Sequence, residues 1–190
     1  MMDMLAATQA LVRRLADDVP VVASLGNPGL NLYNAQPGRT RNFYFRNAMG
    51  VACSMALGLA TARPGQRVVL LDGDGSLLMN LSSLASEGWR GPRNLVHVCW
   101  DNRMYEMTGK QPTATAGPAD LAAMAEGAGF PHVARVETLP AFESAIERAL
   151  AEEGPWFILA LVTGERARRD PNGPKSPTGI RHRFQPELGG

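Results

Sequence analysis

Runs of consecutive apolar residues that alternate with helix-like segments constrain the fold of this chain most strongly. The stretches RVVLLDG (67–73), NLVHVCW (94–100) and PWFILALVT (155–163) are apolar almost throughout, which is typical of strands buried on both faces of a parallel sheet. Segments with helical spacing lie between them, such as 138–154, where Thr138 is placed to cap the helix. We therefore predict an α/β fold of three layers, with a mainly parallel sheet and helices on both faces.

Weaker patterns complete the predicted order of elements. Helices are expected over residues 4–16, 48–62, 77–89 and 119–129, and further strands over 19–26 and 132–136. The helix at 48–62 is small and apolar on nearly all sides, which predicts burial all round. The stretch 27–42 is predicted to be a loop or short helix, 101–117 a long polar loop, and 164–190 an extended tail.

Length and composition exclude several classes of protein. The 190 residues, 45% of them hydrophobic and 19% charged, predict one soluble domain over 1–190. A net charge of +1 gives no general attraction to nucleic acid or to anionic membranes, and no apolar run reaches membrane-spanning length. The amino-terminal segment does not resemble a signal peptide, and Cys53 and Cys99 are expected to be buried and reduced. A cytoplasmic location is therefore expected.

Three predicted strands end in polar, turn-forming residues. These ends are SLGNPG (24–29), LDGDGS (71–76) and WDNRMYE (100–106). In open parallel sheets, ligands bind at the carboxyl ends of the strands, where the following loops meet. We therefore predict that the three ends converge on a binding site.

The chemistry of these ends favours a phosphate group held through a cation. Asp74 lies between two glycines, and a helix that begins near Ser76 points its positive end at the same place. A carboxylate beside a phosphate would repel it unless a divalent cation bridges the two, and Mg²⁺ prefers oxygen ligands. The amide of Asn102 and the carbonyl of Met104 offer such oxygens. The alternative is a plain turn at the end of a strand, followed by an ordinary loop amide.

The spacing of these residues resembles a known motif. GDG at 73–75, the 25 residues of 76–100 and then DN at 101–102 resemble the thiamine diphosphate-binding motif of thiamine-dependent enzymes. That motif usually ends in two asparagines, so Asp101 is a departure, although the metal-binding residue is the second of the pair. The resemblance implies that Mg²⁺ is held by Asp74, Asn102 and the carbonyl of Met104.

A second segment extends the resemblance. In RNAMGVA (46–52), Met49 precedes a glycine, as does the bulky residue that holds the cofactor in its bent form in this family. The alternative for Met49 is plain helix packing. Taken together, the resemblance implies cofactor contacts from Gly26, Asn27, Ala48, Met49, Gly73, Asp74, Gly75, Ser76, Asn102, Met104 and Tyr105.

Longer stretches are similar to a particular branch of the family. The segments LDGDGSLLMNL (71–81) and NLVHVCWDN (94–102), together with TGKQPT (108–113), resemble the β chain of sulfopyruvate decarboxylase and the related half of phosphonopyruvate decarboxylase. The resemblance implies decarboxylation of a small anionic 2-oxoacid that bears a sulfonate or phosphonate at C3. Arg39, Arg41, Arg46 and Lys110 are candidates to pair with such a substrate.

The resemblance also implies a missing half. Related enzymes bind the cofactor between two domains, and the second domain supplies a glutamate that activates the aminopyrimidine. Glu87, Glu106 and Glu126 fall on the wrong predicted elements for that role. We therefore expect a separate α chain and an α₂β₂ assembly or a multiple of it.

Other functions remain open at this point. A carboligase of the same family, a non-catalytic cofactor-binding subunit and a nucleotide-binding domain are alternatives, although no GxGxxG follows the first strand. His97 is expected to be a core residue, and His132 and His182 show no metal-ligand spacing. The basic residues of the tail are expected to be solvated or to pack against the α chain: Arg166, Arg168, Arg169, Lys175, Arg181 and Arg183.

Overall fold

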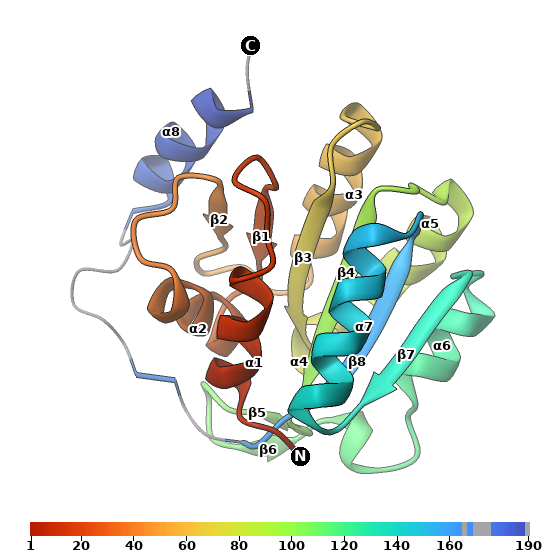
Figure 1. Ribbon diagram of the computed structural model, residues 1–190. Coiled ribbons are helices and arrows are strands. Elements are labelled where there is room, and N and C mark those ends of the chain that lie inside the picture. Colours follow the sequence, from red (N-terminus) through yellow and green to blue (C-terminus); the bar gives the residue numbers. More distant parts are fainter. Residues whose placement is uncertain (165–166, 169–175, 189–190) are drawn as a thin grey trace.

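A computed structural model describes residues 1–164, 167–168 and 176–188 of the chain. Its core is a six-stranded sheet in the order β2-β1-β3-β4-β8-β7, in which every neighbouring pair is parallel (Figure 1). The strands are β1 (Val21–Ala23), β2 (Asn42–Tyr44), β3 (Val68–Gly73), β4 (Leu95–Asp101), β7 (His132–Val136) and β8 (Trp156–Leu161). The predicted fold class is therefore confirmed.

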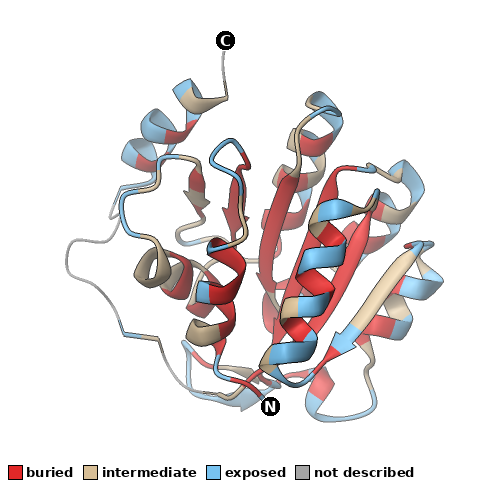
Figure 2. Ribbon diagram, in the orientation of Figure 1, coloured by how far each residue is buried: buried red, intermediate tan, exposed pale blue. Residues whose placement is uncertain are grey.

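Helices cover both faces of the sheet. They are α1 (Met4–Val12), α2 (Asn27–Ala35), α3 (Ala52–Ala62), α4 (Asp74–Met79), α5 (Ser82–Arg90), α6 (Leu121–Gly127), α7 (Leu139–Ala151) and α8 (Pro177–Glu187). One core cluster joins the sheet to α1, α2, α7 and α8, and a second joins it to α3, α4, α5 and α6. The central strands are buried along their length except at Gly73, the last residue of β3, as their apolar sequences predict (Figure 2).

The strands predicted at 67–73, 94–100 and 155–163 are present, and Thr138 caps α7 as expected. The side-chain oxygen of Thr138 accepts a hydrogen bond from Ala141 N at 3.4 Å. Both cysteines are free and buried, also as expected. Among the described residues, no helix is long and apolar enough to cross a bilayer.

Strand β2 was not predicted, and four predicted elements differ from the structure. The helix expected at 77–89 begins at Asp74 and breaks between Met79 and Ser82 into α4 and α5. The break lets the Asn80 side chain donate to the carbonyl of Gly50 at 2.7 Å. Helix α3 is not buried all round, because Ser54, Gly58 and Thr61 are exposed along one side.

The other two differences concern segments predicted as loop or tail. The supposed loop of 101–117 contains a small antiparallel hairpin, β5 (Met104–Tyr105) and β6 (Gln111–Pro112), and a 3₁₀ turn over Ala114–Ala116. The tail of 164–190 is not extended throughout, because 177–187 form α8. This helix packs against β2 through Phe184 and Phe43, whose ring centroids are 5.4 Å apart.

Candidate functional site

A pocket lies where β1, β3 and β4 end, as the polar strand ends predict. Met104 and Tyr105 of β5 line one side of it. The hairpin of β5 and β6 lies at the carboxyl edge of the sheet (Figure 1). The pocket is lined by Met4, Leu25, Gly26, Asn27, Pro28, Met49, Gly73, Asp74, Gly75, Ser76, Trp100, Asn102, Met104, Tyr105, Glu106, Met107 and Thr108. Ten of the eleven predicted cofactor contacts are in this set; the exception is Ala48, which precedes Met49 but does not line the pocket.

Asp74 is a buried carboxylate that the surrounding protein holds in one position. It is the first residue of α4 and is 3% exposed. Its Oδ2 atom accepts a hydrogen bond from Thr113 Oγ1 at 2.6 Å. Thr115 Oγ1 lies 3.3 Å from the same atom and shares its single proton between Asp74 and the closer Asp101. Burial, together with the nearby carboxylate of Asp101, raises the pKa of Asp74 to about 6. The hydrogen bonds from the threonine hydroxyls lower the pKa and offset part of this rise.

Among the described residues that line the pocket, there is no lysine, arginine or histidine to neutralise Asp74. A buried carboxylate without a cationic partner costs free energy, and a divalent cation would remove this cost. The donor set of carboxylate, amide and backbone carbonyl oxygens suits Mg²⁺, so these residues fit the ion that the sequence predicts.

The loop after β4 is folded by its own side chains. Asn102 Oδ1 accepts from Met104 N at 3.2 Å, while Asp101 Oδ1 accepts from Arg103 N at 2.9 Å and from Thr115 Oγ1 at 2.8 Å. Arg103 takes a positive φ of 62°, which is uncommon outside glycine. Asn102 lines the pocket and Asp101 does not, so the departure at Asp101 changes the support of the loop and leaves the lining amide in place.

Glycines allow the close approach of segments around Asp74. A Cβ atom on Gly75 would lie 2.6 Å from Cε1 of Tyr105, so only glycine fits beneath that ring. Gly26 has a φ of 92° and precedes α2, whose amino terminus borders the pocket. Exposed backbone N–H groups at such a helix start favour an anion.

Met49 reaches the pocket from a segment that α4 holds in place. Gly50, which follows it with a φ of 72°, donates its N–H to Ser76 Oγ at 3.1 Å. Its carbonyl accepts from Asn80, as described above. The sequence did not single out Asn80, because its contact depends on the break between α4 and α5.

Thr113 and Thr115 were also missed by the sequence analysis. They lie in QPTATAG, a segment without helical or strand period, and only the hairpin brings them to Asp74. Glu106 lines the pocket and is 9% exposed, and neither of its oxygens has a hydrogen-bond partner in the described parts of the chain. Lys110 Nζ lies 3.4 Å from its Oε1.

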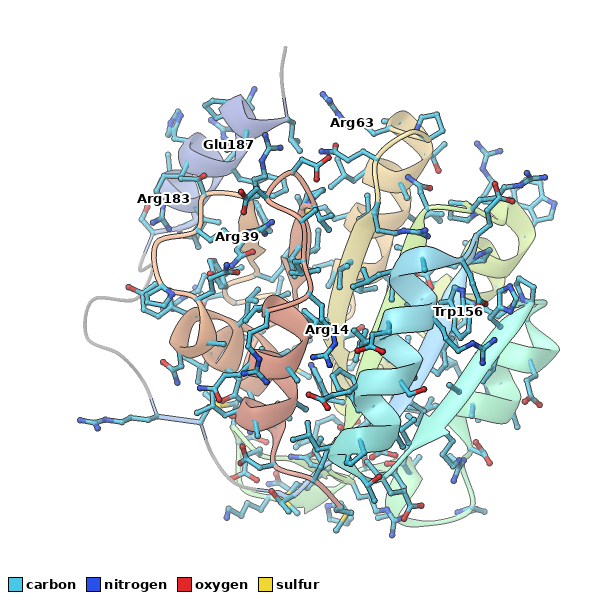
Figure 3. The ribbon with its side chains drawn as sticks, viewed as in Figure 1. Arg14, Arg39, Arg63, Trp156, Arg183 and Glu187 are labelled. Carbon is cyan, nitrogen blue, oxygen red and sulfur yellow. The ribbon has the colours of Figure 1, made fainter. Side chains whose placement is uncertain are left out.

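The candidate substrate arginines lie elsewhere. Arg39 donates to the carbonyls of Ala16, Asp17 and Val19 before β1, at the opposite edge of the sheet from the pocket. Arg41 pairs with Glu187 of α8, with Nε 3.5 Å from Oε2. Figure 3 shows Arg39 and Glu187 on the side away from the hairpin of β5 and β6. Both arginines brace the fold, so the prediction that they face the substrate is wrong.

Arg46 does not line the pocket either, and Lys110 reaches it only through its contact with Glu106. Of the basic tail, the carbonyl of Arg168 accepts from Asn34 Nδ2 at 2.9 Å. Arg166, Arg169 and Lys175 lie outside the described residues.

A second buried polar cluster lies apart from the pocket lining. His97 and Glu87 are both wholly buried, and His97 Nδ1 is 2.8 Å from Glu87 Oε2. Burial lowers the pKa of His97, but the adjacent Glu87 carboxylate outweighs it, so the net shift is upward. The predicted core role of His97 is consistent with this burial.

Comparisons with known proteins agree with the geometry. Residues 25–160 match the family described as thiamine pyrophosphate enzyme, C-terminal TPP binding domain. The match includes the ends of β3 and β4 and, from residue 25 onward, the pocket-lining residues that follow β1. Thiamine pyrophosphate is another name for thiamine diphosphate.

Two similar proteins are decarboxylases. A sulfopyruvate decarboxylase subunit beta from Methanothermobacter thermautotrophicus is 40% identical over 162 residues, which cover 85% of this chain and 83% of that protein. A phosphonopyruvate decarboxylase from Streptomyces viridochromogenes is 38% identical over 161 residues. This chain spans 40% of that longer protein.

A solved structure supports the fold. The benzoylformate decarboxylase of Polynucleobacter necessarius superposes with a TM-score of 0.70 over 88% of this chain and 34% of its own, at 21% identity. The family match covers most of the chain, and residues from all three polar strand-end segments line one pocket. The chain therefore belongs to the thiamine pyrophosphate enzymes and carries their C-terminal TPP-binding domain.

Proposed function

We propose that this chain is the diphosphate- and Mg²⁺-binding subunit of a two-chain enzyme that decarboxylates a 2-oxoacid. The observation that carries the proposal is Asp74, a buried carboxylate whose pKa is raised to about 6 in a glycine-lined pocket without a lining cation. Such a carboxylate gains most from a bound divalent cation.

In this proposal, Asp74, Asn102 and the Met104 carbonyl hold Mg²⁺. Thr113 and Thr115 orient the Asp74 carboxylate toward the ion. The diphosphate lies against the lining residues Gly26, Asn27, Gly73, Gly75 and Ser76. The side chain of Asn27 also accepts a hydrogen bond from Ala167 N at 3.1 Å, so it fixes the segment after β8 as well.

Met49 supports the bent form of the cofactor from its place on the pocket wall, and Tyr105, packed against Gly75, completes the contacts. When bound, the cofactor supplies a carbon nucleophile and takes up the electrons released with CO₂. The apolar lining residues, including Leu25, Trp100 and Met107, exclude water from this reaction.

The activating glutamate is proposed to come from a separate α chain, in an α₂β₂ assembly or a multiple of it. Glu87 is wholly buried against His97, and Glu126 is exposed on α6. Glu106 lines the same pocket as Asn102 and Met104, the proposed metal ligands of this chain. The similarity to proteins named subunit beta supports a partner chain.

The substrate is proposed to be a small anionic 2-oxoacid with a sulfonate or phosphonate at C3, by similarity to the decarboxylases of those two substrates. The described residues of this chain that line the pocket include no lysine, arginine or histidine. We therefore propose that the residue that recognises the second anionic group comes from the α chain.

The test combines the purified chain with candidate α chains, thiamine diphosphate and Mg²⁺. We expect calorimetry to show Mg²⁺-dependent cofactor binding, and a panel of 2-oxoacids to give CO₂ and one aldehyde with a single α chain. Acyloin products in place of aldehyde would indicate a carboligase. A complex that binds the cofactor but turns over no 2-oxoacid would leave a regulatory role.

A further inference from the structure

A cluster of buried polar side chains lies outside the cofactor pocket, between the sheet and the helices α3 and α5 (Figure 1). Cys53 comes from α3, Glu87 from α5 and His97 from β4, and all three are at most 1% exposed. None of them is among the described residues that line the pocket. Three segments that are distant in the sequence therefore bring a thiol, a carboxylate and an imidazole together in the core.

The cluster contains more polar atoms than its hydrogen bonds satisfy. The bond between His97 Nδ1 and Glu87 Oε2 leaves His97 Nε2 and Glu87 Oε1 without a partner among the described residues. Ser83 is 6% exposed, and its hydroxyl lies beside the Cys53 thiol but makes no hydrogen bond of good geometry with any described residue. Buried polar atoms are usually satisfied, so such a set calls for a bound ion or water to explain it.

The three side chains are close enough to share one metal ion. Each residue offers one ligand atom, and these atoms lie within 4.8 Å of one another. Atoms with this spacing all lie within about 2.8 Å of a common point, whereas zinc binds sulfur at about 2.3 Å and nitrogen or oxygen at about 2.0–2.2 Å. Each ligand atom would therefore move by less than about 1 Å to bind the ion.

The ligand types select zinc over magnesium. Thiolate and imidazole are common ligands of Zn²⁺, whereas Mg²⁺ takes oxygen ligands. One thiolate, one carboxylate and a neutral imidazole balance the two charges of the ion, so the complex adds no net charge to the core. The carboxylate of Asp72, whose Oδ2 accepts a hydrogen bond from Cys53 Sγ at 3.2 Å, further favours a cation here.

We propose that Cys53, Glu87 and His97 form a zinc site that joins α3 and α5 to β4. In the chain without the ion, Glu87 pairs with His97, and the Cys53 thiol is protonated because burial and the nearby carboxylates raise its pKa. Binding of Zn²⁺ displaces the thiol proton and the proton on the ring nitrogen that binds the ion, and both leave to solvent. This inference goes beyond the proposed function and does not rest on it.

Ser83 connects the cluster to the surface. It lines a groove between α3 and α5 together with Ser54, Asn80 and Ser86. An ion can therefore reach Cys53 past a small side chain, by a path that does not cross the cofactor pocket. With the ion bound, the Ser83 hydroxyl donates to the Cys53 thiolate, which satisfies the hydroxyl and orients the ligand.

The test uses the full chain, purified with a thiol-free reducing agent and stripped of metal with a chelator. We expect it to bind one equivalent of Zn²⁺, and to bind Co²⁺ with the charge-transfer absorption of a cobalt–thiolate bond. With free Zn²⁺ at about a hundred times its Kd, the thermal unfolding midpoint should rise by about 5 °C or more. Excess Mg²⁺ should displace neither ion, because the site includes sulfur and nitrogen ligands.

Matched variants assign the ligands. Cys53→Ala should lower the Zn²⁺ affinity by at least about a hundred-fold and abolish the cobalt–thiolate band. Cys99→Ala, which removes the other free and buried cysteine, is the control and should keep both. His97→Gln offers Glu87 an amide in place of the imidazole and should lower the affinity by about ten-fold or more. Thermal unfolding without metal shows whether each variant is folded.

The wild-type chain can overturn the inference without any variant. Absence of Zn²⁺ binding, or binding that Mg²⁺ displaces, would contradict the site, since the latter result indicates oxygen ligands such as those of the cofactor pocket. A cobalt complex without the thiolate band, or a band that Cys53→Ala retains, would also contradict it. Failure of every α chain to support decarboxylation would contradict the proposed function and leave the zinc site unaffected.

Discussion

Thr113 Oγ1 donates a 2.6 Å hydrogen bond to Asp74 Oδ2 across 39 positions of sequence. This bond fixes the direction of the carboxylate that we propose as the main Mg²⁺ ligand. It also ties the hairpin of β5 and β6 to the start of α4. Side chains that orient a metal-binding residue often affect metal affinity nearly as much as the metal-binding residue itself.

Thr113→Val should weaken Mg²⁺-dependent binding of thiamine diphosphate by about ten-fold or more, because Asp74 loses its shortest hydrogen bond. Titration calorimetry of the assembled enzyme measures this effect. Thr113→Ser keeps the hydroxyl and should bind within about three-fold of the wild type. Equal affinity of all three proteins would show that Thr113 does not orient Asp74.

Asp74→Asn should reduce cofactor binding by at least about a hundred-fold, because an amide replaces the charged ligand. The cofactor-free variant should be no less stable than the wild type at pH 8. A carboxyl whose pKa is raised to about 6 is ionised there at a cost of up to about 3 kcal/mol.

Calorimetry and urea unfolding measure the two effects separately. Asp17→Asn, at an exposed position, should change neither. Retention of Mg²⁺-dependent cofactor binding by Asp74→Asn would contradict the metal assignment.

Gly75→Ala should destabilise the cofactor-free chain by about 1–3 kcal/mol, because the new Cβ would lie 2.6 Å from the Tyr105 ring. Urea unfolding gives the loss. Replacing Tyr105 with leucine in the same chain should recover part of it, since the ring is the obstacle. Gly65→Ala is a matched control, as its Cβ would meet nothing within 4 Å.

Glu87→Gln should destabilise the chain most at low pH. The pKa of His97 is raised in the folded state by Glu87 against the opposing effect of burial. The ion pair therefore stabilises the fold fully when the pH is below about 6.5, the pKa of a histidine in the unfolded chain. This contribution is lost as the pH rises through the higher pKa of His97 in the folded state.

Removing one partner of a buried pair costs about 3–5 kcal/mol. We therefore expect a loss of that order at pH 5.5 and a smaller one at pH 9, measured by urea unfolding. Glu147→Gln, which breaks an exposed pair with Arg14, should have a small effect at both values. A loss for Glu87→Gln that grows with pH would contradict this account.

The sequence predicted the central strands well because their burial is visible in consecutive residues. Each of β3, β4 and β8 is apolar almost throughout, and a strand buried on both faces needs no partner to be recognised. Strand β2 was missed because it is only three residues long and begins at Asn42, the last residue of a segment rich in glycine, proline and asparagine. Its pairing with β1 depends on α2, which brings the chain back to the edge of the sheet.

The candidate site was predicted in part for the same reason. Asp74 and Asn102 each follow a recognisable strand, and the register of β3 with β4 places their strand ends side by side. Arg39 and Arg41 were assigned to the substrate on charge alone. The structure instead uses them as donors to backbone carbonyls and to Glu187, contacts between segments that no local pattern connects.

The sequence by itself determined the central buried strands, the helices between them and the polar groups at the strand ends, because these depend on neighbouring residues and their period. Only the tertiary structure decided which distant groups meet: Thr113 with Asp74, Asn80 with Gly50, and Glu87 with His97. These contacts depend on where the hairpin and the break between α4 and α5 place their side chains. That placement follows from packing against the whole sheet, which no single segment encodes.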